Sequence, residues 1–102
     1  MGCTDPVRVK LTDSMMPTKK YAAHLGPPYD RTVNFGAVGY GDYTMGGATN
    51  KAAYIRRHRA REVWTKSGIA TPGFWSRWLL WNKPSLAASK HDMRDRFCLQ
   101  FA

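Results

Sequence analysis

Acidic residues are scarce in this chain of 102 residues. Asp and Glu number 7 against 16 Lys and Arg, so the formal net charge is +9. Such an excess of positive charge favours an anionic partner, either nucleic acid, an acidic lipid surface or an acidic protein. A solvated basic surface without a partner would have the same composition. With 43% hydrophobic residues, the chain still has enough apolar material for the single modest core expected at this length.

Cysteine is also rare, with Cys3 and Cys98 near opposite ends of the chain. Two cysteines that form no CxxC pair indicate neither a disulfide scaffold nor a zinc site, so we expect reduced thiols in an intracellular protein. Gly2 and Cys3 resemble the start of dually acylated proteins, but Pro6 stands where the myristoylation pattern has Ser or Thr. An unmodified N-terminal arm is therefore the expectation.

Long apolar runs are missing as well. The first ten residues lack the apolar segment of a secretory signal. The most apolar run, FWSRWLLW, contains Arg77 and is far shorter than the ~20 residues that a membrane-spanning helix needs. We therefore expect neither a secretory signal nor a transmembrane helix.

Groupings of catalytic or metal-binding residues are not evident either. The histidines His24, His58 and His91 stand alone, and the acidic residues form no paired-carboxylate motif. A nucleophile–base pair of Cys98 and His91 stays open as an alternative, although nothing around Cys98 resembles a nucleophile motif. We expect a non-enzymatic protein without a metal or cofactor.

The aromatic segment 71–81 predicts a central helix. Thr71 can cap it and Pro72 suits its first position, while Pro84 forces it to end. Its apolar residues recur at helical spacing, so we expect at least two of Trp75, Trp78 and Leu79 to be buried. A partner-binding face is the alternative, because Trp is enriched in interface hot spots. The aromatics assigned to the core or an interface are Trp64, Phe74, Trp75, Trp78 and Trp81.

Three short strands are expected before this helix. Apolar residues alternate with basic ones at 7–11, which predicts an edge strand. Segments 19–25 and 31–35 predict a hairpin, because the two prolines and the glycine of residues 26–30 cannot continue a central strand. A sheet this small needs a covering layer, and the Trp-rich helix would supply it.

Residues 36–47 hold five glycines and include the string VGYGD. That string looks like a potassium-channel selectivity filter, but a filter needs membrane helices beside it. The spacing of Gly36, Gly39 and Gly41 also differs from the GxGxxG dinucleotide pattern. We therefore expect a loop whose glycines allow positive φ or close backbone approach, with Tyr40 and Tyr43 holding it against the core.

Residues 51–65 predict a basic helix, with Thr49 or Asn50 as its cap and Ser67-Gly68 after its end. It should pack through Ile55, Val63 and Trp64. Arginine forks suit phosphate oxygens, although a solvated basic face or an acidic protein partner would also fit. The candidate site for an anionic partner consists of Lys51, Arg56, Arg57, Arg59 and Arg61.

The last predicted helix covers residues 85–97, with an apolar stripe and an i,i+4 pair of Asp92 and Arg96. We expect an N-terminal arm at 1–18, a compact domain at 19–97 and a C-terminal tail at 98–102. Both ends carry apolar residues, Leu99 and Phe101 among them, but have little of their own to pack against. We therefore expect these ends to become ordered only on neighbouring subunits.

Three runs resemble one family: VNFGAVGYGDYT, YIRRHRAREVW and SRWLLWNKPSLAASKHDMRDRF. It consists of small proteins of unknown function from large DNA viruses of algae and amoebae, with relatives in protists. The similarity covers about residues 19–97, and its most specific parts are 35–44, Tyr54 with Arg57-His58, and 78–86. The resemblance implies no activity. Differences at 45–50 and 71–75 favour a cellular relative that works inside a stable complex.

These patterns together predict an α+β fold, in which a hairpin or three-stranded antiparallel sheet is covered by three helices with the Trp-rich helix central. The favoured function is a small, basic, non-enzymatic accessory subunit of a large assembly. That assembly would be a virion or an organellar complex such as a mitochondrial one, in which the chain bridges neighbouring subunits. The alternative is a nucleic-acid-binding module that contacts phosphates through the arginine-rich helix.

Overall fold

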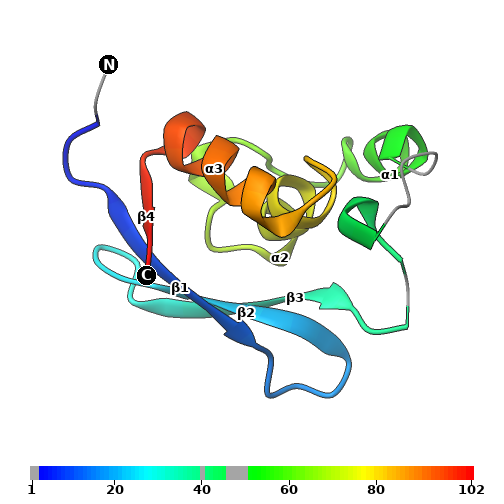
Figure 1. The fold of residues 1–102 in the computed structure, drawn as a ribbon, viewed down its shortest axis with the longest axis horizontal. Coiled ribbons are helices and arrows are strands. Elements are labelled where there is room, and N and C mark those ends of the chain that lie inside the picture. The colour runs from blue at the N-terminus through cyan, green and yellow to red at the C-terminus, as the bar shows by residue number, and fades with distance from the viewer. Residues whose placement is uncertain (1–2, 40, 46–50) are drawn as a thin grey trace.

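The computed structural model describes residues 3–39, 41–45 and 51–102, and its fold is α+β, as expected (Figure 1). The helices lie on one side of the sheet. In chain order the elements are β1 (Val7–Asp13), β2 (Lys19–Leu25), β3 (Arg31–Ala37), the 3-10 turn η1 (Tyr43–Met45), α1 (Lys51–His58), the 3-10 turn η3 (Lys66–Gly68), α2 (Pro72–Trp75), the π-helical segment η4 (Ser76–Leu80), α3 (Leu86–Phe97) and β4 (Leu99–Phe101).

The sheet has four strands in the order β3-β2-β1-β4, so the expected three-stranded antiparallel sheet is wrong in detail. The predicted hairpin is confirmed, because β2 and β3 pair antiparallel with Tyr21 opposite Phe35. Strand β1 also pairs antiparallel with β2, whereas β4 joins β1 in parallel, with Val7 opposite Leu99. Strand β1 therefore lies inside the sheet and not at its edge.

The two ends of the chain lie side by side, because β1 and β4 pair with each other. The backbone N–H of Val7 donates to the carbonyl oxygen of Cys98 (3.1 Å), and that of Ala102 donates to Val9 (2.8 Å). A disulfide joins Cys3 to Cys98, with 5.6 Å between their Cα atoms. The expectation that the ends have little of their own to pack against is wrong, because β1 and β4 pair with each other.

The disulfide also corrects the expectation of reduced thiols. Spacing along the chain gave no sign of a pair, since the cysteines are separated by 95 positions and only the β1–β4 pairing brings them together. A sulfur in a disulfide is neither a free nucleophile nor an acylation site. The Cys98–His91 alternative is therefore contradicted, and Cys3 carries no acyl group in this form of the protein. Gly2 lies outside the described residues.

The core forms between the covered face of the sheet and the helical layer. Alternate residues of each strand point inward, as the period of a β-strand requires. Trp75 is completely buried, and its indole N–H donates to the carbonyl oxygen of Ile69 (2.7 Å). Leu79 is buried too, which confirms the prediction that at least two residues of this segment lie inside. The other core residues are Val7, Val9, Ala23, Leu25, Val33, Phe35, Ile69, Phe74, Leu80, Met93, Phe97 and Leu99.

The Trp-rich segment is not one continuous α-helix. Its start follows the prediction, with the Thr71 hydroxyl accepting from the backbone N–H of Phe74 and Pro72 in the first turn. After four residues, however, it widens into η4, where the N–H of Trp81 donates to the carbonyl of Ser76 (3.0 Å). This i→i+5 bond is the π-helical pattern. The spacing of the apolar residues could not reveal this widening, because the π-helical segment is only five residues long, too short for its different period to show.

The basic helix is shorter than predicted, since α1 ends at His58 and residues 59–65 turn away. Val63 is 54% exposed and does not pack as expected. The only described residue of α1 that is buried is Tyr54, so the helix has one strong anchor, and the four residues after Ile55 are all basic. The turn brings Trp64 back beside Tyr54. The expected caps Thr49 and Asn50 lie outside the described residues.

The glycine-rich loop leaves β3 through Gly36, whose φ of +82° favours glycine. A Cβ atom there would lie 3.0 Å from Leu80 Cδ1. Asp42 is buried beyond this turn, where it accepts hydrogen bonds from Lys20 Nζ (2.8 Å) and from the N–H and hydroxyl of Thr44. Tyr40, expected to hold the loop, lies outside the described residues.

The last helix agrees with its prediction. The Ser85 hydroxyl caps α3 by accepting from the N–H of Ala88 (3.1 Å). The expected ion pair between Arg96 and Asp92 is present at 3.1 Å. The turn before the helix is held by Ser89, whose buried hydroxyl accepts from the N–H of Lys83.

Candidate anion-binding surface

Four of the five basic residues singled out in the sequence lie within six consecutive positions on the surface. Arg56 and Arg57 belong to the last turn of α1, and Arg59 and Arg61 belong to the turn that follows. All four side chains are exposed. We call residues 56–61 the arginine segment.

The charge of the arginine segment is not neutralised within the described part of the chain, where no carboxylate forms an ion pair with its arginines. The adjacent Glu62 is occupied elsewhere. Its carboxylate contacts His58 Nδ1 (3.0 Å) and accepts from the indole N–H of Trp64 (2.9 Å). It also packs so closely against Gly73 that a Cβ atom there would lie 2.7 Å from its carboxyl carbon. The carboxylate of Glu62 is therefore engaged by His58 and Trp64 and does not neutralise the arginines.

Lys51 is separated from this surface by its contacts. Its ammonium donates to the carbonyl oxygen of Asn82 (2.6 Å) and lies 4.8 Å from the centre of the Tyr43 ring. Burial, together with the nearby charges of Arg77 and Lys83, lowers the pKa of Lys51. Lys51 thus attaches the start of α1 to the turn before α3, while the four arginines remain free of such contacts.

An aromatic stack holds the arginine segment in place. The buried Tyr54 ring lies 4.7 Å from the Trp81 ring, nearly parallel to it, and 4.3 Å from the His58 ring. Trp64 extends the stack at 6.3 Å from Tyr54. Burial, with help from the negative charge of Glu62, raises the pKa of the Tyr54 hydroxyl, so this ring stays neutral at physiological pH. The backbone that carries the arginines is therefore held in place by a packed cluster of aromatic rings.

Two further cations, the half-buried Arg77 and the exposed Arg96, lie against indole rings of this region. The Arg77 guanidinium lies 4.3 Å from the Trp78 ring and 5.4 Å from the Trp64 ring, and it donates to the carbonyl oxygen of Trp81 (3.0 Å). Arg96 lies 4.6 Å from Trp78. Burial lowers the pKa of Arg77, and its Nε is buried without a hydrogen-bond partner in the described structure. These cations bind indole rings, which makes them less available to an external anion.

The predicted aromatics divide into two groups. Phe74 and Trp75 are fully buried in the core. Trp64, Trp78 and Trp81 are half-buried, and each contacts rings or guanidinium groups of its own chain. Sequence reasoning did not assign a role to Arg77, although an arginine between aromatic residues on a helix is the pattern expected for cation–π stacking.

Two other kinds of feature, a metal site and a membrane-spanning helix, are not found in the described residues. Among them, no group of three or more His, Cys, Asp or Glu is placed to hold a metal ion. None of the described helices has the length and apolar character to cross a membrane.

Comparison with known proteins adds one relationship. Residues 9–58 match the model of a family of unknown function (DUF5754). The match includes most of the β1–β3 sheet and all of α1, and therefore Arg56 and Arg57. No curated protein and no solved structure matches the chain. The expected viral and protist distribution stays a prediction. Over its sheet and first helix, the chain is thus similar to an uncharacterised domain family.

Proposed function

We propose that this protein is a non-enzymatic nucleic-acid-binding module that contacts phosphates through the arginine segment. One observation supports the proposal above the others. Four exposed guanidinium groups lie within six residues, and no described carboxylate pairs with them. Guanidinium forks donate two parallel hydrogen bonds to phosphate oxygens, so a row of unpaired arginines fits a phosphate backbone.

The aromatic stack that holds the arginine segment in place strengthens this argument. Binding costs conformational freedom, and a surface that is already ordered loses less of it. The stack of Tyr54 on Trp81 ties the helix that carries Arg56 and Arg57 to η4 and the core. A structural role for the arginines is the competing explanation, because cations at the end of a helix interact favourably with its dipole. That role does not explain Arg59 and Arg61, which lie beyond the helix.

Two observations weaken the accessory-subunit hypothesis. The chain ends pair with each other, and the large aromatics mostly contact one another. The excess positive charge remains, and nucleic acid accounts for it directly. The disulfide is informative about the surroundings, because such bonds persist mainly under oxidising conditions. We infer a working place of that kind, such as a virion or an oxidising compartment of an organelle, in preference to the reducing cytosol.

The experiment is the salt dependence of binding to a fluorescent 20-base-pair DNA duplex. Affinity should fall with salt concentration, with a logarithmic slope of about −0.9 per phosphate contacted. Replacing Arg57 and Arg61 by Gln should reduce that slope by roughly two. The matched control is Arg8→Gln with Lys10→Gln, which removes the same charge from exposed positions on β1 and should leave the slope almost unchanged.

Two results would count against the proposal. Absence of DNA binding by micromolar protein at low salt would reject it. If the protein bound polyglutamate as tightly as DNA, and replacing Arg57 and Arg61 weakened both interactions equally, the result would point instead to an acidic protein partner.

A protein-bridging accessory subunit stays as the second candidate, and one observation favours it. Met15, Met16 and Val38 are 99%, 45% and 51% exposed. The N–H of Val38 donates to the carbonyl of Thr18, and that of Lys19 donates to Met16, so these apolar side chains gather at one end of the sheet. Co-purification of a stoichiometric protein partner that is lost on Met15→Glu would support this candidate.

A further inference from the structure

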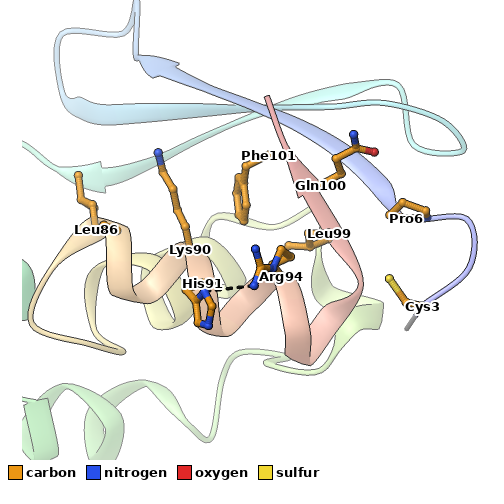
Figure 2. Close-up of a pocket in the computed structure, with 10 residues that line it drawn as sticks. Cys3, Pro6, Leu86, Lys90, His91, Arg94, Leu99, Gln100 and Phe101 are labelled. Atoms are coloured by element: carbon orange, nitrogen blue, oxygen red, sulfur yellow. Dashed lines mark hydrogen bonds between the residues drawn. The ribbon is translucent and has the colours of Figure 1, made fainter. Parts of the chain in front are cut away.

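A groove lies between α3 and β4, away from the arginine segment (Figure 2). Its volume is about 780 Å³. One wall is an exposed face of α3 that carries Lys90, His91 and Arg94, and the other is β4. The lining is mostly apolar around Leu99 and Phe101. Cys3, which is bonded to Cys98, and Pro6 lie at one end of the groove.

The strand beside this groove is an open edge of the sheet. Strand β4 pairs with β1 on one side, and no described strand pairs with its other side. An unpaired edge presents backbone N–H and C=O groups in a row, which is a template for another extended segment. Such strand addition draws affinity from main-chain hydrogen bonds, and its specificity comes from pockets for alternate side chains. The groove is a pocket of this kind, because inward-facing side chains of an added strand would enter it.

The positive charge around the groove indicates which kind of ligand it would bind. None of the described residues that line it is acidic, and Lys90 and Arg94 stand one helical turn apart on its rim. Arg94 also donates to His91 Nδ1 (3.2 Å) and contacts the exposed Asp95 (3.3 Å). No described carboxylate forms an ion pair with Lys90. A second copy of the chain is disfavoured, because β4-to-β4 pairing would bring two basic rims together.

We propose that the β4–α3 groove binds an extended acidic peptide, which adds to the free edge of β4 and places carboxylates against Lys90 and Arg94. Residues of a strand that share a face are two positions apart, about 6.6 Å. Lys90 and Arg94 are four helical positions apart, about 6 Å along the axis. In a peptide in which Glu and apolar residues alternate, the Glu side chains share the face toward α3, so their methylene groups lie over Leu99 and Phe101 while their carboxylates reach both cations on the rim. This site is independent of the arginine segment.

The test uses a fluorescent eight-residue peptide in which Glu and Val alternate, with binding followed by anisotropy. We expect micromolar affinity. Lys90→Glu with Arg94→Glu should weaken binding by at least about tenfold. The matched control is Arg57→Glu with Arg61→Glu, which makes the same change in net charge elsewhere and should leave the peptide affinity within about twofold. Thermal unfolding of each variant checks that it is folded.

A second measurement needs no variant. The same peptide, N-methylated at alternate amides so that one edge cannot donate hydrogen bonds, should bind at least about tenfold more weakly to the unchanged protein. Equal binding of the methylated peptide overturns strand addition. If oleate displaces the labelled peptide at a lower concentration than the unlabelled peptide does, the groove is a fatty-acid site and the proposal is overturned. Concentration-dependent dimerisation that Lys90→Glu with Arg94→Glu strengthens shows that a second copy occupies β4, and it overturns the proposal as well.

Discussion

Cys3 and Cys98 lie 95 positions apart in the chain, yet their Cα atoms are 5.6 Å apart and a disulfide joins them. The bond ties the residues before β1 to the turn that leads from α3 into β4, at the point where the parallel pairing of β1 and β4 begins. It therefore closes almost the whole chain into one ring. Cys98 occupies a left-handed conformation (φ 57°), which ends α3 and directs the chain back along the sheet.

Removal of this bond should lower the free energy of unfolding. Cross-linking restricts the unfolded chain most when the closed loop is long, and the typical stabilisation is about 2–4 kcal/mol. Reduced protein and the Cys3→Ser variant should both unfold at lower urea concentration than the oxidised protein. Cys3→Ser leaves the left-handed position 98 unchanged. A reductant that has no effect on the midpoint of the unmodified protein would contradict the role given to the bond.

Gly36 and Gly39 both require glycine for their backbone conformation, but only at Gly36 would a side chain also meet neighbouring atoms among the described residues. Both have positive φ, +82° and +92°, where alanine costs about 1–2 kcal/mol. At Gly36 a Cβ atom would also meet Leu80 Cδ1 at 3.0 Å and Lys20 Cβ at 3.2 Å, whereas at Gly39 no atom of the described residues would lie within 4 Å. Gly36→Ala should therefore cost about 1–3 kcal/mol more than Gly39→Ala in urea denaturation. Equal costs would show that the β3–η4 contact adjusts freely.

Trp75 should contribute more to stability than Trp78. Trp75 is completely buried, and its truncation would leave a cavity and a buried Ile69 carbonyl without its donor. Trp75→Ala is expected to cost about 3–5 kcal/mol. Trp78 is half-buried, so Trp78→Ala should cost less, with the lost hydrogen bond to Trp64 as its main part. Circular dichroism during urea unfolding measures both, and a larger cost at Trp78 would contradict this ranking.

Asp92 should make stability depend on acid pH. Burial alone would raise the pKa of its carboxyl, but hydrogen bonds from Arg96 and Asn82 outweigh burial and hold that pKa below its ordinary value. A depressed pKa means that the folded state favours the carboxylate. The resulting stabilisation is present above the unfolded-state pKa and is lost as pH falls through the folded-state pKa.

The Asp92→Asn variant should therefore show a flatter decline of unfolding free energy between about pH 5 and pH 2. Asp95→Asn removes the same charge from the same helix at a 65% exposed side chain and serves as the control. An identical acid dependence in the unmodified protein and in Asp92→Asn would refute the assignment.

Several features were predictable because their causes are local. The hairpin of β2 and β3 follows from apolar alternation around a proline-rich turn. Thr71 and Ser85 cap the helices that follow them, since a hydroxyl needs only the N–H groups three residues on. The exposure of the arginine segment was predictable in the same way, because few burial environments can accommodate so much unpaired charge.

Other features depend on contacts between distant parts of the chain. The end of α1 at His58 is followed by a turn that brings Trp64 beside Tyr54, and the widening of η4 appears only as the bond from Trp81 to Ser76. The α3–β4 groove could not be predicted, because the sequence of residues 98–102 indicates only a C-terminal tail and gives no sign of its pairing with β1. Lys90 and Arg94 looked like ordinary surface residues of a helix.

The amino-acid sequence by itself determined the α+β class, the main hairpin, the aromatic core and the basic character of the surface, because these depend on composition and on periodicity over a few residues. Only the tertiary structure decided that the two ends meet as parallel strands, that Cys3 and Cys98 are bonded and that Lys51 is separated from the four arginines. Contacts of this kind join positions tens of residues apart, and the free energy that selects them comes from burying both partners at once, which no local pattern records.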